Sequence, residues 1–374
     1  MILFITRKYP PSIGGMQKLS HKLTTEIGRL AESSIISWGG AQRWLPVFVI
    51  SAFVRALIAI ARADVTLIHL GDPVLTPLGV MLRAVGRIPV VVTAHGLDVA
   101  YPHRLYQIIV PASLRRLERV ICISTYTKEE CIKRGVPAER CVVIPPGIDV
   151  EGYSTILSDD ERRCWANSWR MSLARRHVLL TVGRLVPRKG VCPFVREALP
   201  LLLARRQDWV YLIAGDGPER CAIETAVESY GLSGYVKVLG ELDHAALRAA
   251  YALADVFLMP NIYIPGNPEG FGLVVLQARA SGKPVVAADL EGIRDAIGDG
   301  EDGTLVNPSE WSEFVEAIGI WLGRVEAETQ RQQRRRRVED QYSWSRIADE
   351  YLAVFRDAEG AYQMQRRVRV VDSD

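Results

Sequence analysis

One stretch of the sequence, residues 268–287, contains a turn, a helix and a strand in immediate succession. It reads Pro-Glu-Gly-Phe-Gly-Leu-Val-Val-Leu-Gln-Ala-Arg-Ala-Ser-Gly-Lys-Pro-Val-Val-Ala. The proline and the two glycines near its start favour a turn. We expect a helix from about Leu273 that ends near Gly282, followed by a buried parallel strand over residues 284–288. A turn that leads into a helix between buried strands is typical of α/β folds.

The turn in this stretch has the features of an anion site. A glycine-rich turn that leads into a helix leaves backbone N–H groups unpaired at the positive end of the helix dipole, where phosphate binds well. Glu269 lies at the mouth of the turn, and its carboxylate can accept hydrogen bonds from sugar hydroxyls. We therefore looked for the rest of a sugar-nucleotide site elsewhere in the chain.

Size and composition indicate a globular protein of two domains. The chain has 374 residues, of which 48% are hydrophobic and 24% are charged. A net charge of +3 is too small to indicate a nucleic-acid partner. The six cysteines form no Cys-x-x-Cys pair and the chain opens on an apolar strand, so we expect reduced thiols in a cytoplasmic protein without a signal peptide, a disulfide frame or a metal centre.

Short apolar segments alternate with helical patterns along the whole chain, which predicts two doubly wound, Rossmann-like parallel sheets with helices on both faces. Ligands bind such sheets at the carboxyl ends of the strands, so we expect a cleft where these edges face each other. The expected strands are residues 2–6, 33–37, 65–69, 89–93, 120–124, 141–144, 178–182, 210–214, 236–239, 256–260, 284–288 and 304–306.

The alternation breaks once, after Pro145-Pro146-Gly147, and a polar connection follows over residues 151–176. We therefore expect an N-terminal domain over residues 1–155 and a C-terminal domain over residues 156–343. An amphipathic helix over residues 344–374 is expected to pack back on the first domain.

Two segments have both an ordinary and a membrane interpretation. Residues 47–61 are almost entirely apolar but are interrupted by Arg55 and are too short to span a bilayer, so we expect a buried helix, with a membrane-dipping surface helix as the alternative. Residues 331–337 are rich in arginine, which is typical of a solvated helix face; contact with an anionic membrane is the alternative. No transmembrane span is predicted.

A cationic loop follows the first strand of the second half. It reads Gly-Arg-Leu-Val-Pro-Arg-Lys-Gly over residues 183–190. Gly183 allows a sharp turn, Arg184 can bind phosphate oxygens in a fork, and Lys189 supplies a point charge. Each charged hydrogen bond is worth roughly 1.5–3 kcal/mol, so the two cations together can hold a diphosphate and stabilise it as a leaving group.

Other glycine-containing loops also follow strands. In the second half, Gly215, Asp216 and Gly217 make a common turn that leaves space for a base or a ribose. In the first half, Gly14 and Gly15 precede a helix and let backbone amides approach an anion.

His95 follows a strand of the first half and so is expected at the cleft edge, where it can hydrogen-bond a hydroxyl or a phosphate oxygen. The alternative interpretation is a structural histidine.

Six motifs in this order resemble the GT-B glycosyltransferases, in particular the retaining family 4, and most closely its phosphatidylinositol mannosyltransferase branch. The resemblance covers nearly the whole chain. The motifs are Tyr-Pro-Pro-Ser-Ile-Gly-Gly (9–15), His-Gly-Leu-Asp (95–98), Pro-Pro-Gly-Ile-Asp (145–149), Gly-Arg-Leu-Val-Pro-Arg-Lys-Gly (183–190), Gly-Asp-Gly-Pro (215–218) and Pro-Glu-Gly-Phe-Gly (268–272).

The resemblance implies that residues 1–155 form the acceptor domain and residues 156–343 the nucleotide-sugar donor domain. It also implies a role for each matching residue. Arg184 and Lys189 bind the donor diphosphate, and Glu269 contacts the donor sugar. His95 reaches the transferred sugar. The remaining donor-binding positions are the loop glycines Gly14 and Gly15, the turn residues Gly183, Gly215, Asp216, Gly217 and Gly270, and the backbone amides of Phe271, Gly272 and Leu273.

The resemblance also implies the reaction. The family retains the anomeric configuration by a front-face step in which the donor phosphate takes the acceptor proton, and it uses no metal and no cofactor. The expected activity is transfer of a hexose from a UDP- or GDP-sugar to an alcohol. We expect this acceptor to be a polysaccharide or lipid-linked glycan of the bacterial cell surface, and the enzyme to be cytoplasmic, with peripheral contact to the inner membrane.

One position departs from the family pattern. The family usually has a second glutamate eight residues after Glu269, which binds both ribose hydroxyls, and this chain has Gln277 there. Gln277 can still accept one hydrogen bond but loses the charge-assisted part, roughly 1 kcal/mol. Two alternatives stay open: a sugar-nucleotide epimerase that uses the same two-domain cleft, and a non-catalytic sugar-nucleotide-binding partner, which Gln277 alone motivates.

Overall fold

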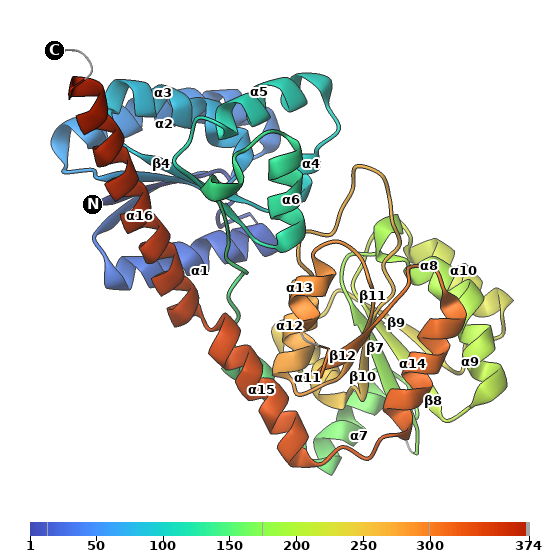
Figure 1. The fold of residues 1–374 in the computed structure, drawn as a ribbon. Coiled ribbons are helices and arrows are strands. Elements are labelled where there is room, and N and C mark those ends of the chain that lie inside the picture. The colour runs from blue at the N-terminus through green and yellow to red at the C-terminus, as the bar shows by residue number, and fades with distance from the viewer. Residues whose placement is uncertain (13, 174, 299, 372–374) are drawn as a thin grey trace. The chain divides into compact units, whose positions relative to one another are not determined.

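The computed structural model describes residues 1–371 except residues 13, 174 and 299. The chain folds into two compact units, each built around one six-stranded sheet (Figure 1). The first unit comprises Met1–Gly147 and Tyr342–Asp374, and the second comprises Ile148–Gln341.

The first sheet is parallel throughout and has the strand order β2-β1-β3-β4-β5-β6. Its middle strands are buried on both faces, because helices cover both sides of a parallel sheet. The strands are β1 (Ile2–Thr6), β2 (Ser33–Ser37), β3 (Leu67–Leu70), β4 (Val90–Ala94), β5 (Arg119–Cys122) and β6 (Cys141–Val143).

Two separate apolar cores lie on the two faces of this sheet. On one face, α2 (Leu45–Arg62), α3 (Thr76–Gly86), α5 (Arg104–Leu114) and α6 (Thr125–Lys133) bury their inner residues. On the other face, α1 (Gly15–Leu30) packs beside the C-terminal helix α16 (Trp344–Val371). Tyr351 and Phe355 of α16 lie in this second core, so the last helix is part of the first unit.

The second sheet is also parallel and has the order β12-β11-β10-β7-β8-β9. Its strands are β7 (His177–Val182), β8 (Trp209–Ala214), β9 (Val236–Gly240), β10 (Val256–Met259), β11 (Val285–Ala288) and β12 (Gly303–Val306). Its main helices are α7 (Asp159–Ser168), α9 (Leu199–Arg205), α10 (Arg220–Ser229), α11 (His244–Leu253), α12 (Leu273–Ala280), α14 (Trp311–Gly323) and α15 (Glu328–Tyr342).

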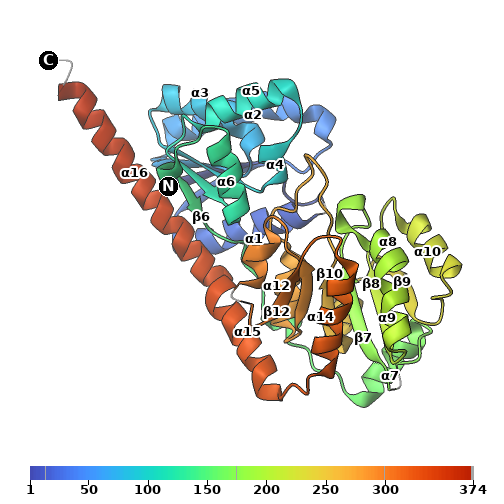
Figure 2. The same ribbon diagram turned by 45° about the vertical axis from the view of Figure 1, so that its right-hand side comes forward.

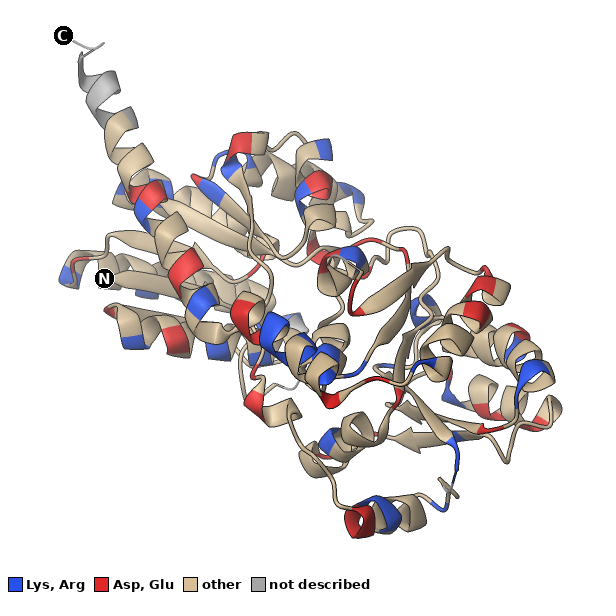
Figure 3. Cartoon of the chain, turned by 60° about the horizontal axis from the view of Figure 1, so that its bottom comes forward, with Lys and Arg blue, Asp and Glu red and all other residues tan. Residues whose placement is uncertain are grey.

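The predicted α/β architecture with two doubly wound sheets is confirmed, and each of the twelve expected strands overlaps an observed one. The predicted solvated face of the arginine-rich segment is wrong for its inner residues. The segment lies on α15, where basic residues crowd in Figure 3. Arg334 is buried, with only 2% of its surface exposed.

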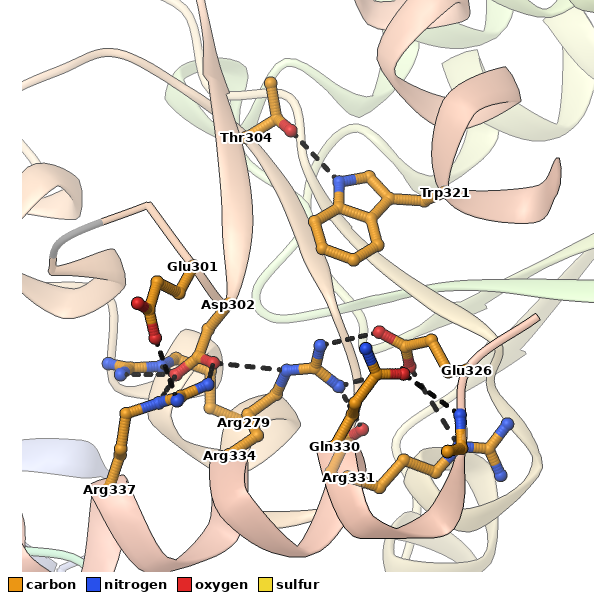
Figure 4. A network of polar contacts seen from close by, with 12 residues as sticks. Arg279, Glu301, Asp302, Thr304, Trp321, Glu326, Gln330, Arg331, Arg334 and Arg337 are labelled. Carbon is orange, nitrogen blue, oxygen red and sulfur yellow. Dashed lines mark hydrogen bonds and ion pairs between the residues drawn. The ribbon is translucent and has the colours of Figure 1, made fainter. Parts of the chain in front are cut away.

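The buried guanidinium belongs to a network centred on Asp302, just before β12 (Figure 4). Arg279 of α12 donates to Asp302 Oδ2 from Nε at 3.0 Å and Nη2 at 2.8 Å, and Arg337 donates to Oδ1. Arg334 donates to the Gly282 carbonyl at 2.7 Å. Burial acts to raise the pKa of Asp302, but the Arg337 hydrogen bond and the charge of Arg279 outweigh it and lower that pKa. These contacts fix α15 to the core even though α15 has few apolar residues.

Replacing Asp302 by Asn should lower the free energy of unfolding by roughly 3–5 kcal/mol, because the buried Arg279 and Arg334 lose a charged partner. Chemical denaturation followed by circular dichroism measures this loss. Since the pKa of Asp302 is lowered in the folded state, its contribution is present above the ordinary pKa of about 4 and is lost at lower pH. The difference between wild type and variant should therefore shrink below about pH 4.

Asp208→Asn is the matched control. Its side chain is 49% exposed and pairs with Arg206, and surface pairs contribute about 0–1 kcal/mol. Equal losses in the two variants would contradict the structural role of the Asp302 network.

Candidate active site

The candidate site in the second unit is built on the turn that precedes α12. Gly272 caps α12 with a left-handed φ of +85°. The buried ring of Phe271 anchors the turn, and Leu273 is the first residue of the helix. The loop after β11 supports it from outside, since a Cβ on Gly292 would come within 2.0 Å of the Gly270 carbonyl oxygen. The turn thus has a fixed shape, and the N-terminus of α12 that follows it can bind an anion.

Glu269 is the centre of a charged cluster in this turn. Its Oε2 accepts hydrogen bonds from Lys189 Nζ at 2.6 Å, from Arg188 Nη1 and from Asn261 Nδ2 at 3.2 Å. Its backbone N–H donates to the Glu291 carboxylate at 2.5 Å. Burial acts to raise the pKa of Glu269, but Lys189 and Arg188 outweigh it, so the pKa lies below its ordinary value. Glu269 is therefore an anion at neutral pH.

The loop after β7, which supplies the two cations, is in direct backbone contact with the segment after β10, which supplies the Asn261 side chain. A Cβ on Gly190 would come within 1.9 Å of the Pro260 carbonyl oxygen, so only glycine fits there. The Ile262 N–H donates to the Arg188 carbonyl at 3.0 Å. Asn261 is 2% exposed, and its Oδ1 has no partner among the described residues. The loop after β7 and the end of β10 therefore place the cations and Asn261 together around Glu269.

Arg184 occupies a different position from Arg188. Its side chain is exposed, and no hydrogen bond or ion pair joins it to another described residue. Arg184 and Lys189 were predicted from the sequence, whereas Arg188 was missed, although all three belong to one loop. The spacing alone could not tell which arginine turns towards Glu269. Arg188 is thus tied to the Glu269 carboxylate, whereas the Arg184 side chain is exposed.

Gly215 and Gly217 are needed for close backbone packing. A Cβ on Gly215 would come within 1.9 Å of the Gly183 carbonyl oxygen, and one on Gly217 within 2.3 Å of the Leu185 carbonyl oxygen. Asp216 accepts from the Gly217 N–H at 2.6 Å and from Arg220 at 2.9 Å. These glycines let the loop after β8 support the cationic loop, which is a reason that the sequence analysis did not foresee.

Gln277 lies one turn into α12 and has tyrosine partners. Its Oε1 accepts from the Tyr251 hydroxyl at 2.8 Å, and its side chain is also hydrogen-bonded to Tyr153. The two tyrosine rings meet edge to face with centroids 5.6 Å apart. Burial raises the pKa of both hydroxyls, so both stay protonated. No sequence signal identified these tyrosines, because each is distant in the chain from the α12 motif.

The predicted residues of the first unit lie at the carboxyl ends of its strands. Gly14 caps α1, where a Cβ would come within 2.5 Å of Gln17 Oε1, and among the described residues nothing outside its own helix lies within 4 Å of a Cβ on Gly15. His95 follows β4 and lines a pocket with Thr6, His69 and Thr93. The pocket volume of about 40 Å³ is that of a few water molecules.

The two histidines of this pocket have different roles. His95 Nε2 lies 3.0 Å from the Gly71 carbonyl oxygen and so donates to it, which leaves Nδ1 as an acceptor without a partner among the described residues. Burial, helped by the nearby His95, lowers the pKa of His69 to about 3, so His69 is neutral. His69 Nε2 lies 2.9 Å from Thr93 Oγ1, and its ring packs against Phe4, so His69 is structural. His95 Nδ1 can accept a hydrogen bond from a hydroxyl group.

Comparisons with known proteins agree with this geometry. A family model described as "Glycosyltransferase Family 4" matches residues 21–151, and one described as "Glycosyl transferases group 1" matches residues 171–338. A GDP-mannose-dependent alpha-(1-6)-phosphatidylinositol monomannoside mannosyltransferase of Mycolicibacterium smegmatis is 28% identical over 86% of this chain and 89% of its own. A phosphatidyl-myo-inositol mannosyltransferase of the same organism is 28% identical over 81% of this chain and 74% of its own.

Solved structures show the same fold at lower identity. HepE of Anabaena in complex with UDP has a TM-score of 0.75 and 20% identity, with 95% of this chain and 99% of that chain covered. The catalytic domain of starch synthase IV from Arabidopsis thaliana has a TM-score of 0.76 and 16% identity, with 96% and 99% covered. The two family models, the mannosyltransferase relatives and this shared fold lead to one conclusion: the chain belongs to the family 4 glycosyltransferases of the GT-B fold and transfers a sugar from a nucleotide sugar.

Proposed function

We propose that the enzyme moves a hexose from a UDP- or GDP-sugar to an alcohol acceptor with retention of the anomeric configuration and without a metal ion. The acceptor is a lipid-linked or polysaccharide glycan of the bacterial cell surface, and the reaction takes place in the cytoplasm. The observation that carries the proposal is the ionised Glu269 between Lys189 and Arg188 at the start of α12. It places a carboxylate that can bind sugar hydroxyls beside Lys189, which can bind the diphosphate.

The charges of the cluster favour a step without an enzymic nucleophile. Three donors already engage Glu269 Oε2, and hydrogen bonding of this kind makes a carboxylate a weak nucleophile. Its lowered pKa also makes it a poor proton donor. Glu269 instead accepts hydrogen bonds from sugar hydroxyls and stabilises the positive charge that develops on the sugar ring.

In the proposed step, the bond between the anomeric carbon and the donor phosphate oxygen breaks, and the acceptor oxygen forms a bond to the same face of that carbon. The acceptor proton passes to the departing phosphate oxygen. Lys189 and Arg184 neutralise the negative charge that builds up on the nucleoside diphosphate. His95 Nδ1, as a free acceptor, binds a hydroxyl of the transferred sugar.

The names of the relatives support the donor and acceptor classes. The mycobacterial relatives are named for GDP-mannose and for phosphatidylinositol acceptors, whereas the Anabaena structure contains UDP. A thermal-shift series with GDP, UDP, GDP-mannose and UDP-glucose identifies the base, because a ligand that binds only the folded protein raises the melting temperature. Transfer to phosphatidylinositol mannoside then tests the acceptor, and the NMR spectrum of the product shows its anomeric configuration.

Glu269→Gln and Lys189→Ala should each lower the transfer rate by roughly 100-fold to 1,000-fold, because each removes charge stabilisation of the transition state. Sugar transfer from the donor found by thermal shift measures this effect. Glu241→Gln is the control, since Glu241 is an exposed carboxylate of the same unit. Near-normal turnover in both site variants, with an intact melting transition, would reject the site.

Arg184→Ala and Arg188→Ala should affect different kinetic constants. Loss of one charged hydrogen bond to the diphosphate in Arg184→Ala should raise KM for the donor by roughly tenfold to 100-fold. Arg188→Ala removes a partner of Glu269 and should mainly lower kcat. Steady-state kinetics separates the two. A larger rise in KM for Arg188→Ala would show that the roles of the two arginines are exchanged.

Gln277→Glu should increase the preference for a ribose over a 2′-deoxyribose nucleotide by up to roughly tenfold. Gln277 Oε1 is already occupied by Tyr251, whereas a carboxylate has about four acceptor positions and binds hydroxyls with charge assistance. Titration calorimetry with GDP and 2′-deoxy-GDP, or the uridine pair, measures this ratio. Gln330→Glu controls for the added charge. An unchanged ratio would place the ribose away from residue 277.

A further inference from the structure

Helix α2 buries only one narrow side and exposes apolar residues on the other. Its buried residues are Phe48, Ala52 and Ala56, which pack on the first sheet. The residues on its opposite side are Val47, Ile50, Val54 and Ile58, and they are between 45% and 67% exposed. Their spacing of three or four residues forms one continuous stripe along the helix. The sequence-based expectation of a buried helix is thus correct for one side of α2 only.

The two neighbouring helices of the same layer extend this surface. Helices α2, α3 and α5 lie side by side over one face of the first sheet (Figures 1 and 2). On α3, Met81 and Val85 are 53% and 63% exposed. On α5, Leu105, Ile108 and Ile109 are 50% or more exposed. Nine large apolar side chains therefore share one outer layer, whereas single exposed apolar residues are scattered on most proteins.

The charges of this layer all have the same sign. The sequences of α2, α3 and α5 contain four arginines and no aspartate, glutamate or lysine. Arg55, Arg62 and Arg104 are exposed, and the flanking Arg43 and Arg87 are exposed as well. On a helical wheel, Arg55 and Arg62 fall roughly a quarter-turn from the centre of the α2 stripe. The exposed Asp64, two residues after α2, is the one flanking carboxylate within two residues of this helix. An apolar surface whose helices carry cations and no carboxylates complements the anionic surface of a lipid bilayer.

Helix α2 is long enough to cross a membrane, but its buried residues hold it against the first sheet. Among the described residues, α2 is the one helix whose length and apolar composition would allow it to span a membrane. Crossing would remove Phe48, Ala52 and Ala56 from the core of the first sheet. An arrangement in which α2 lies in the plane of the interface keeps this core intact and still buries the exposed stripe.

We infer that the outer face of α2, α3 and α5 docks the enzyme on an anionic membrane, with the apolar stripe in the headgroup region and the flanking arginines on the lipid phosphates. The partner is the bilayer surface itself, which brings the enzyme to the plane in which a lipid-linked acceptor lies. The docking inference depends on these three helices only. Membrane binding is measured without donor or acceptor, so its test is independent of the proposed sugar transfer.

Co-sedimentation with lipid vesicles tests the inference. The full-length protein should bind vesicles of phosphatidylcholine mixed with phosphatidylglycerol, and binding should fall with added salt and with phosphatidylcholine alone. The triple variant Ile50→Ser, Val54→Ser, Ile108→Ser should bind roughly tenfold more weakly or worse, because each buried apolar side chain favours the interface. The double variant Arg55→Gln, Arg62→Gln should lose its preference for the anionic vesicles.

Matched controls use exposed residues of the second unit. Ile156→Ser, Leu201→Ser and Ile320→Ser remove the same kind of surface, and Arg205→Gln with Arg336→Gln removes two exposed arginines. Both controls should bind vesicles as wild type does, and all variants should keep the wild-type melting temperature and its shift with nucleotide.

Three outcomes would overturn the inference. They are no vesicle binding by wild type, equal binding by the triple variant, and a stable dimer in solution that the triple variant dissociates while vesicles stay unbound. The last outcome would assign this face to a second copy of the chain. None of these outcomes alters the nucleotide-induced melting shift, which tests the donor site.

Discussion

The ion pair between Lys189 and Glu269 is the interaction on which the donor site depends. It joins the loop after β7 to the turn before α12, two segments that are 80 residues apart in the chain. The pair also sets the chemistry, because the cations keep the carboxylate ionised despite its burial. Glycine positions such as Gly190 and Gly292 serve this pair, since they let the loops approach closely enough to make it. Backbone packing and charge thus support each other at one end of the second sheet.

The two units have the same architecture but differ in where they carry charged and apolar side chains. The second unit gathers buried charge at the carboxyl ends of its strands and around Asp302, and Glu269, Lys189, Arg279 and Asp302 there each have a partner of opposite sign. The first unit has an apolar outer layer on one face of its sheet and, at the strand ends, a histidine with a free acceptor nitrogen. This division matches an enzyme in which one unit holds an anionic nucleotide sugar and the other receives a less soluble partner.

Much of the fold could be predicted from the sequence, because the spacing of apolar residues and the positions of turn-forming residues are local signals. The twelve strands were expected from short apolar runs, and α12 from the turn at Gly272. The anchoring of α15 was not foreseen, since a run of arginines gives no sign of which one meets Asp302. In the site, Glu269 and Lys189 were found by motif, but Arg188 and the two tyrosines at Gln277 depend on loop geometry and on contacts between distant segments. Such contacts have no local signature.

The burial of Arg334 has a consequence for how this chain has evolved. A guanidinium that is 2% exposed and held by Asp302 and Glu326 tolerates neither the loss of one carboxylate nor its own replacement while both acids remain. Asp302 also pairs with the buried Arg279, so these four positions must change jointly, or not at all. Among descendants of a common ancestor, the four residues should be inherited as a block or replaced together by apolar residues, leaving a covariation signal outside the candidate active site.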